Sequence, residues 1–330
     1  MLLVGGTVVG ACSTSSTSPS VGTSASPVAT NAPSAGSSAP ASAEATPGAS
    51  APPASSPSPL PIEAMTGTDG RFTILLLGSD YRPAKPGNRT DTIMIVSVVP
   101  ETGETEVASI PRDNAGIPLP DGTTHREKIN TLYETYRAAG GDAAAGENIK
   151  EAIGYLTGVE IDYYALVGFG GIRDLVNAIG GVDVTVAKTI HDPIYHTAPG
   201  EQGITFPRGV NHLDGPTALI FARTRKGDND FERIRRQQQL VAETTRKVLD
   251  MGLAALPPLV ELSRNYIKTD LPLEHLPTVY DMVSRADLDT DARHVLGPTR
   301  FSEKTTHGTD YRLKVAAVRE FMADLMPPVD

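Results

Sequence analysis

Two aspartates and an arginine lie at the ends of three predicted strands early in the chain. Asp80 follows the first strand, Asp91 precedes the second and Arg112 follows the third. If the turn at 100–103 closes a hairpin between the second and third strands, one continuous register places Asp91 opposite Arg112. The loop at 78–91 connects the first strand to the second, and it brings Asp80 to the same edge of the sheet. The sequence therefore predicts that these side chains converge at one end of a sheet, where α/β sheets usually bind ligands.

Carboxylates beside arginines suit a divalent cation and a phosphate. Mg²⁺ prefers one or two carboxylates and takes its other ligands from water and substrate phosphates. The planar guanidinium group matches phosphate oxygens, so several arginines together indicate a diphosphate site. The alternative is a surface cluster of ion pairs, which contributes little to stability. Spacing alone leaves both interpretations open.

A second basic cluster lies further along the chain, where six Lys and Arg residues fall within the fourteen residues 223–236. Spacings of three and four place four residues on one face of the predicted helix: Arg233, Arg236, Gln237 and Leu240. Arg223 and Arg225 can point the same way if their stretch is extended. Positive charge at a helix N-terminus opposes the helix dipole, and a bound anion would relieve this. A solvated basic helix start is the alternative.

Composition excludes several classes of function. The formal net charge is −10, there is no Lys/Arg-rich tail and no Trp, so we expect no nucleic-acid partner. The single cysteine, Cys12, excludes a disulfide framework, and the seven histidines show no HExxH spacing. Neither GxSxG nor GxxxxGK[ST] occurs, which disfavours common serine-hydrolase and P-loop mechanisms.

The first sixty residues differ from the rest. Residues 1–12 are apolar or small and end in Gly-Ala-Cys12, which resembles a bacterial lipobox in which the cysteine becomes lipidated. Residues 13–61 are almost entirely Ser, Ala, Pro, Thr and Gly, a composition typical of a disordered linker. We expect an extracytoplasmic lipoprotein anchored to the cell membrane. The alternative is the tail of a transmembrane anchor, which gives the same location.

Residues 62–330 are enough for one large domain with a full core. The patterns predict strands at 72–77, 92–99, 104–110, 161–167, 182–186 and 293–296. They predict helices at 129–139, 143–157, 170–179, 214–222, 231–251 and 311–326, and a long loop at 191–208. Strands and helices mixed in this way predict a layered α/β domain with a mixed sheet.

Eight short motifs, taken together, resemble the LytR-CpsA-Psr family, whose order and spacing they follow over residues 70–326. They are LGSDYR at 77–82, RTDT at 89–92, SIPRD at 109–113, KIN at 128–130, GGVD at 180–183, HLDG at 212–215, ARTR at 222–225 and FERIRRQQ at 231–238. Each motif alone is weak. Two features depart from the family: the lipobox-like anchor, where a transmembrane helix is usual, and Glu127, where the family often has Asp.

The resemblance implies a single domain with a central mixed sheet flanked by helices, and an apolar pocket in its core that holds a polyprenyl chain. The family's metal-binding aspartates fall on Asp80 and Asp91, so the expected cofactor is Mg²⁺ or Mn²⁺. Its diphosphate-binding residues fall on Arg89, Arg112, Arg223, Arg225, Arg233 and Gln237. Arg82 and Asp113 lie within the motifs, without a role that we could assign.

The function implied is transfer of a glycopolymer from a polyprenyl diphosphate onto peptidoglycan, through a phosphodiester bond. Asp91, Arg112 and Arg223 are the expected catalytic residues, with Asp91 a conceivable base although metal binding would weaken it. One alternative is a polyprenyl diphosphate hydrolase that uses water as the acceptor. Another is a lipid-glycan binding or assembly protein without catalytic activity.

Overall fold

The computed structural model describes residues 61–81, 87–195, 203–226, 228–305 and 310–329. Cys12, the predicted anchor and the predicted linker up to residue 60 lie outside the described residues, and so does Arg82. Within the described ranges, no helix combines the length and the apolar character that crossing a bilayer requires.

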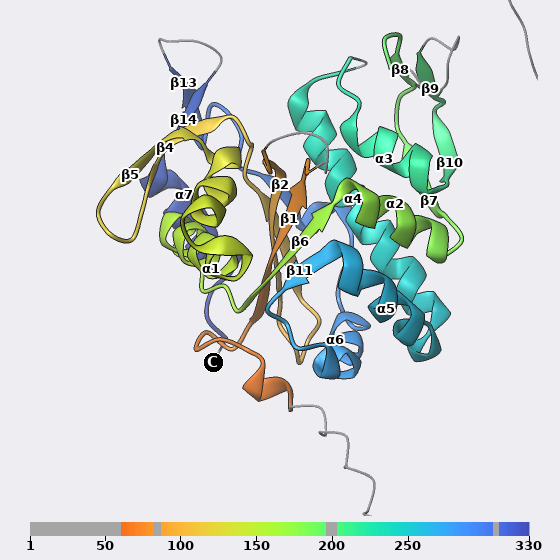
Figure 1. Ribbon diagram of the computed structural model, residues 1–330, viewed down its shortest axis with the longest axis horizontal. Helices are drawn as coiled ribbons and strands as arrows, with labels where there is room; N and C mark the ends of the chain where they lie inside the picture. Colours follow the sequence, from red (N-terminus) through yellow and green to blue (C-terminus); the bar gives the residue numbers. More distant parts are fainter. Residues whose placement is uncertain (1–60, 82–86, 196–202, 227, 306–309, 330) are drawn as a thin grey trace, which may run out of the picture. The chain divides into compact units, whose positions relative to one another are not determined.

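A six-stranded mixed sheet forms the centre of the fold (Figure 1). Its order is β11 (Ile267–Thr269), β6 (Tyr163–Gly168), β1 (Phe72–Ser79), β2 (Thr90–Val98), β3 (Thr105–Ser109) and β12 (Arg293–Val295). Strand β1 runs antiparallel to β2 and parallel to β6, while β3 runs parallel to β12. This confirms the predicted fold class.

One face of the sheet is covered by α1 (Leu132–Thr157) and α7 (Val315–Leu325) (Figure 1). Side chains alternate between the two faces of a strand, and Leu75 and Leu77 of β1 are fully buried on this side with Ile149 of α1 and Met322 of α7. The core beneath these helices contains none of the predicted site side chains.

The other face carries most of the remaining helices (Figure 1). They are α2 (Phe169–Ala178), α3 (Gly215–Arg223), α4 (Asp230–Met251), α5 (Leu256–Tyr266) and α6 (Leu276–Val283). A second core joins α2, α3 and α4 to β7 (Val182–Val186) and β10 (Gly209–Leu213), which pair with each other. Short 3-10 helices lie at Ile62–Ala64, Ile129–Thr131, Leu253–Ala255, Leu273–His275 and Thr290–Ala292.

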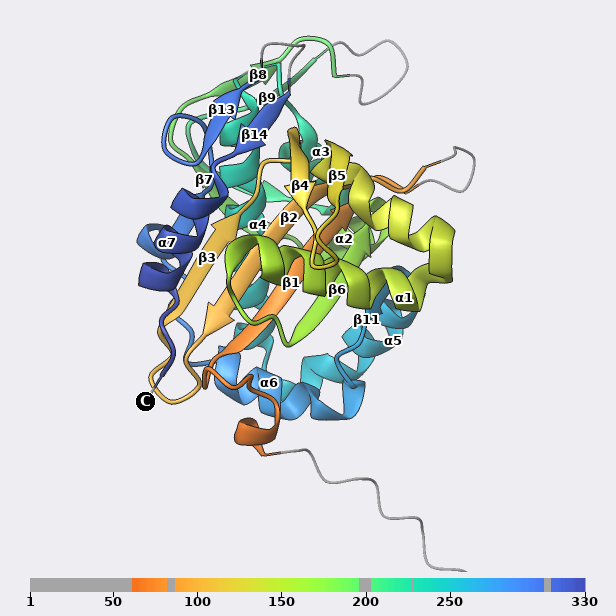
Figure 2. The same cartoon turned by 90° about the vertical axis from the view of Figure 1, so that its left-hand side faces the viewer.

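Two further small sheets lie at the upper end of the central sheet in Figure 2. One has the order β13 (Ser302–Lys304), β14 (Tyr311–Leu313), β4 (Asn114–Pro118) and β5 (Thr124–Lys128); the other pairs β8 (Ile190–Asp192) with β9 (Ile204–Phe206). The prediction of an unbroken loop at 191–208 was therefore wrong at both of its ends, where the two strands bond to each other.

The structure corrects one predicted helix boundary and contains one predicted break between helices. The predicted helix at 311–326 begins only at Val315, because Tyr311 pairs with β4 and its N–H donates to the Asp113 carbonyl at 3.1 Å. The predicted break between 139 and 143 is present inside α1. There Gly141 has φ 79° and ψ −177°, a non-helical conformation that glycine adopts at little cost.

Candidate active site

A cavity of about 580 Å³ lies between the central sheet and helices α2, α3 and α4. Its volume falls within the usual range for ligand pockets. Much of its wall is apolar and includes Leu76, Met94, Val167, Ile172, Leu175 and Leu240. Charged and amide side chains also line it: Asp80, Asp91, Arg112, Asp192, Arg223, Arg225, Lys226, Arg233 and Gln237. We call these residues the polar cluster.

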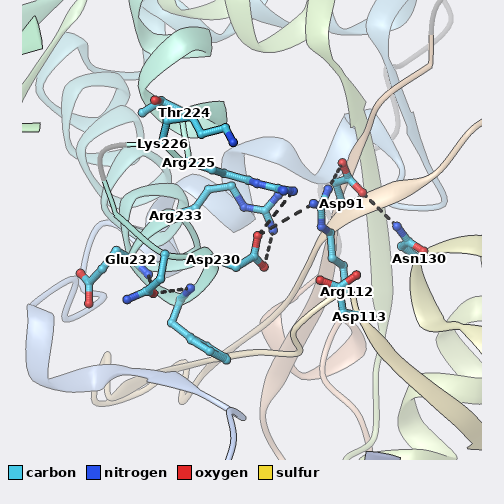
Figure 3. Close-up of polar contacts among 12 residues, drawn as sticks. Asp91, Arg112, Asp113, Asn130, Thr224, Arg225, Lys226, Asp230, Glu232 and Arg233 are labelled. Atoms are coloured by element: carbon cyan, nitrogen blue, oxygen red, sulfur yellow. Dashed lines mark hydrogen bonds and ion pairs between the residues drawn. The ribbon is translucent and has the colours of Figure 1, made fainter. Parts of the chain in front are cut away.

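The β2–β3 hairpin places Asp91 opposite Arg112, as predicted. The ladder pairs Met94 with Ser109, and the N–H of Ile110 donates to the carbonyl of Ile93 at 2.9 Å, which continues the same register. Two residues further along each strand, Arg112 Nη1 donates to Asp91 Oδ2 at 2.5 Å (Figure 3). The predicted pairing of the two strands thus becomes a direct side-chain contact.

Asp80 reaches the same edge by backbone pairing. Its N–H donates to the Arg89 carbonyl at 2.9 Å, and its Oδ1 accepts from the Arg89 N–H at 2.8 Å. The side chain of Arg89 is exposed and is not part of the cavity wall. Its predicted role in diphosphate binding therefore remains a prediction, whereas the other predicted ligands all line the cavity.

The sequence argument required an extended stretch for Arg223 and Arg225, but Arg223 is the last residue of α3. The chain leaves the helix at Thr224, whose φ of −58° and ψ of 143° are extended, and Arg225 follows in the segment between α3 and α4. Arg236 fixes this segment: its Nε donates to the Phe221 carbonyl at 2.9 Å and its Nη2 to the Thr224 carbonyl at 2.5 Å. Its Nη1 is paired with Asp228. Arg236, which helical spacing groups with Arg233, thus supports the site and does not line the cavity.

Asp192 anchors the same segment from β8. Its carboxylate accepts hydrogen bonds from the hydroxyl of Thr224 and the N–H of Lys226, the latter at 3.4 Å. Burial acts to raise the pKa of Asp192, but these hydrogen bonds and that from the N–H of Ile194 lower it overall. The carboxylate is therefore held ionised. Sequence reasoning missed this residue because it lies in the predicted loop.

Arg223 lies against an aromatic ring at the cavity wall. Its guanidinium carbon is 4.3 Å from the centre of the Phe169 ring, and its Nη1 donates to the hydroxyl oxygen of Tyr195 at 3.0 Å. Such stacking holds a planar guanidinium in place while leaving other N–H groups for a ligand.

The start of α4 presents Arg233 and Gln237 to the cavity. Asn229 caps the helix by accepting from the N–H groups of Phe231 and Glu232. Gln237 Nε2 donates to the Ala222 carbonyl at 3.1 Å, and its Oε1 is buried without a hydrogen-bond partner. Arg233 is 3% exposed, and burial, followed by the nearby charge of Arg112, lowers its pKa.

Asp230 joins three of the arginines (Figure 3). Its Oδ2 accepts from Arg233 Nη2 at 3.0 Å, and its Oδ1 lies 3.9 Å from both Arg112 Nη2 and Arg225 Nη1. Burial raises the pKa of Asp230, although the charges of Arg233 and Arg112 act to lower it. Sequence reasoning missed this carboxylate. The signal was present, because an acid in the first turn of a basic helix favours the helix dipole.

Within the polar cluster, two buried arginine nitrogens have no hydrogen-bond partner: Arg112 Nε and Arg233 Nε. Buried donors are normally paired, so an unpaired one at a cavity calls for a ligand or an ordered water. Since arginine carries donors and no acceptor, the complementary group must offer lone pairs, and phosphate oxygens do so with charge assistance.

Asp80, Asp91 and the neighbouring Asn130 offer oxygen atoms that suit a small divalent cation as ligands. Asp91 Oδ1 accepts from Asn130 Nδ2 at 3.0 Å, and the Oδ1 of Asn130 is buried and unpaired (Figure 3). With Asp80, this gives two carboxylates and a neighbouring amide oxygen, and Mg²⁺ needs only one or two carboxylates beside water and phosphate. Within the described ranges, no group of three or more His, Cys, Asp and Glu residues gathers in metal-binding geometry.

Known proteins share this sequence pattern. The model of the LytR_cpsA_psr family matches residues 40–307. The cell wall biosynthesis protein LcpA of Corynebacterium glutamicum is 30% identical over 227 residues, 57% of this chain and 42% of that protein. The polyisoprenyl-teichoic acid–peptidoglycan teichoic acid transferase TagV of Bacillus subtilis is 29% identical over 226 residues, 66% of this chain and 55% of that protein. The chain thus spans about half the length of these two relatives.

Solved structures show the same fold. The crystal structure of TagV from B. subtilis superposes with a TM-score of 0.61 at 23% identity, over 80% of this chain and all of that one. TagT bound to LIIa-WTA superposes with a TM-score of 0.58 at 21% identity, over 80% of this chain and 93% of that one. The family match over most of the chain and the shared architecture lead to one conclusion: this protein belongs to the LytR_cpsA_psr family.

Proposed function

We propose that the protein transfers a glycopolymer from a polyprenyl diphosphate carrier to a hydroxyl group of peptidoglycan. One observation carries the proposal: a largely apolar cavity shares its wall with the carboxylates of Asp80 and Asp91 and with buried arginine donors that have no partner. An amphiphile with an apolar chain and a diphosphate head matches both parts. The relatives named as teichoic acid–peptidoglycan transferases support the same class of reaction.

The arginines of the polar cluster would hold the diphosphate. Arg112 and Arg233 each have an unpaired Nε, and Arg223, which lies against the Phe169 ring, also lines the cavity. Such fixed donors stabilise the charge that spreads over phosphoryl oxygens during transfer, and they need no rearrangement at the moment of reaction. Asp230 and Asp91 keep Arg112 in position from two sides.

Asp80 and Asp91 would hold a Mg²⁺ or Mn²⁺ ion. Bound there, the ion would supply further neutralisation of phosphoryl charge. The buried amide of Asn130 keeps Asp91 oriented toward this position through its 3.0 Å hydrogen bond.

The reaction joins the acceptor oxygen to the phosphorus that carries the glycopolymer. The bond from that phosphorus to the bridging oxygen breaks, and polyprenyl phosphate leaves with the electron pair. The proton of the hydroxyl needs a base. Both oxygens of Asp91 already accept hydrogen bonds, whereas Asp230 Oδ1 is buried without one, and burial raises the pKa of Asp230. Of these two carboxylates, we therefore assign the proton to Asp230, which lies behind the cavity wall and would have to be reached from the cavity for this step.

Product analysis tests the proposal. The purified protein is incubated with a labelled polyprenyl-diphosphate glycan and peptidoglycan oligomers, with Mg²⁺ or with EDTA. We expect label to join the oligomers and polyprenyl phosphate to appear in equal amount, only with Mg²⁺. Release of polyprenyl phosphate at the same rate without peptidoglycan would instead establish a hydrolase. Binding of the lipid without any turnover would establish a binding protein.

A further inference from the structure

A second, smaller cavity lies under α4, on the same face of the sheet as the first. Its volume is about 200 Å³. The wall combines β1–β3 residues such as Ile74 and Val96 with Ala242 of α4 and Val279 of α6. Both Ile74 and Val279 pack against a third core cluster that includes Met282 of α6. The cavity has no role in the chemistry proposed above.

Four residues line both cavities: Leu76 and Met94 from the sheet, and Val241 and Thr245 from α4. The two spaces are therefore separated by a partition one side chain thick. Along β1, the first cavity extends from Asp80 to Leu76, and the second continues from Leu76 to Phe72. That continuation of four residues is roughly 13 Å long at about 3.3 Å per residue.

The chemistry of the partition suits a flexible apolar chain. Met94 is 1% exposed and unbranched, and methionine side chains adapt their shape to irregular space. Leu76 and Val241 add apolar surface on either side. The one hydroxyl is that of Thr245, which lies in a helix, where such a group can bond to a carbonyl of the preceding turn. The rest of the second cavity is lined mainly by apolar side chains such as Val96, Val107 and Val283. Five polar residues also line it: Thr105, Gln238, Asp287, Asp289 and Arg293.

We propose, on the basis of the function proposed above, that the second cavity binds the distal isoprene units of the carrier lipid, and that the partition makes the protein selective for long chains. A short chain fills the first cavity alone. A long chain displaces the Met94 side chain, and its distal end moves from water into the second cavity. Each methylene group buried in this way adds to the affinity.

Filling the second cavity tests this. Ala242 lines only the second cavity and is 5% exposed, so Ala242→Phe places a ring there without touching the first. Val279→Trp does the same from α6, because Val279 also lines only the second cavity. Asp281→Trp is the matched control, because Asp281 is an exposed residue of the same helix. Thermal melting of each variant shows whether it remains folded.

The readout is kcat/KM for geranyl-diphosphate and heptaprenyl-diphosphate carriers of one glycan. The unsubstituted protein and the control should prefer the long chain. We expect each filled variant to lose about tenfold or more of that preference while its activity on the geranyl carrier is retained, since two methylene groups returned to water already change an equilibrium by this factor. An unchanged preference in both folded variants would overturn the inference. Inactivity of the unsubstituted protein on both carriers would instead count against the proposed function.

Discussion

Arg112→Lys is the sharpest test of the diphosphate site. Arg112 uses each of its three nitrogens differently: Nη1 bonds to Asp91 Oδ2 at 2.5 Å, Nη2 lies 3.9 Å from Asp230 Oδ1, and Nε is buried without a partner. Lysine keeps the positive charge between the two carboxylates, so neither is left as an uncompensated charge. It replaces the fork by a single ammonium group, which cannot contact Asp91 and a phosphate oxygen in the same arrangement.

The expected loss follows from this geometry. If Arg112 Nε and its neighbours contact the transferring phosphoryl group, then the variant loses about one fixed donor to developing charge. Removing one such donor typically lowers kcat by about 10²–10³, which corresponds to about 2.7–4 kcal/mol. We expect a much smaller change in melting temperature than for Arg112→Ala, which would leave the partly buried carboxylate of Asp91 without the cation it contacts and would remove one of the three arginines beside Asp230.

The assay measures kcat and KM for release of polyprenyl phosphate in the presence of peptidoglycan oligomers. Arg235→Lys is the matched control, because Arg235 belongs to α4 but its side chain is 60% exposed and pairs with Glu232. Its kinetics should stay unchanged. If Arg112→Lys kept kcat within about threefold of the unsubstituted protein while remaining folded, the argument from fixed donors would be wrong.

Three further predictions concern the base, the metal and a buried acid. Asp230→Asn should lower kcat by about 10²–10⁴ and remove the fall in rate at acid pH, and a pH–rate profile that kept its acidic limb would contradict this. EDTA should abolish transfer and Mg²⁺ restore it; full activity after exhaustive chelation would exclude the metal site. Burial raises the pKa of Asp162 to about 7, above its ordinary value near 3.8, so its contribution to stability is present below about pH 4 and lost as pH rises through 7. At pH 8, Asp162→Asn should therefore be more stable than the unsubstituted protein, by roughly 1–2 kcal/mol after allowance for solvent screening. Denaturant unfolding measures this difference. Equal stability of the unsubstituted protein at pH 5 and pH 8 would refute the prediction.

The sequence determined the parts of the site that depend on local register. Strand pairing fixes which residues face each other, so one turn at 100–103 was enough to place Asp91 opposite Arg112. Helical spacing likewise placed Arg233 and Gln237 on one face of α4, where both line the cavity. Among the described residues, strong periodic patterns also predicted every strand of the central sheet except β11, together with β7 and helices α1–α4 and α7, because their apolar faces must be buried in a fold of this class. The other, mostly short strands were missed.

Tertiary structure alone decided the contacts between distant segments. Helical spacing places Arg236 on the same face of α4 as Arg233. Arg236 nevertheless donates to the carbonyls of Phe221 and Thr224 and does not line the cavity. Asp192 became a structural anchor only because β8 pairs with β9 and meets the α3–α4 segment. Periodicity reports which side of an element is buried, but the partner on that side depends on how the whole chain packs. For the same reason, the second cavity left no pattern in the sequence, because it forms where strands β1–β3 and β12 meet helices α4 and α6.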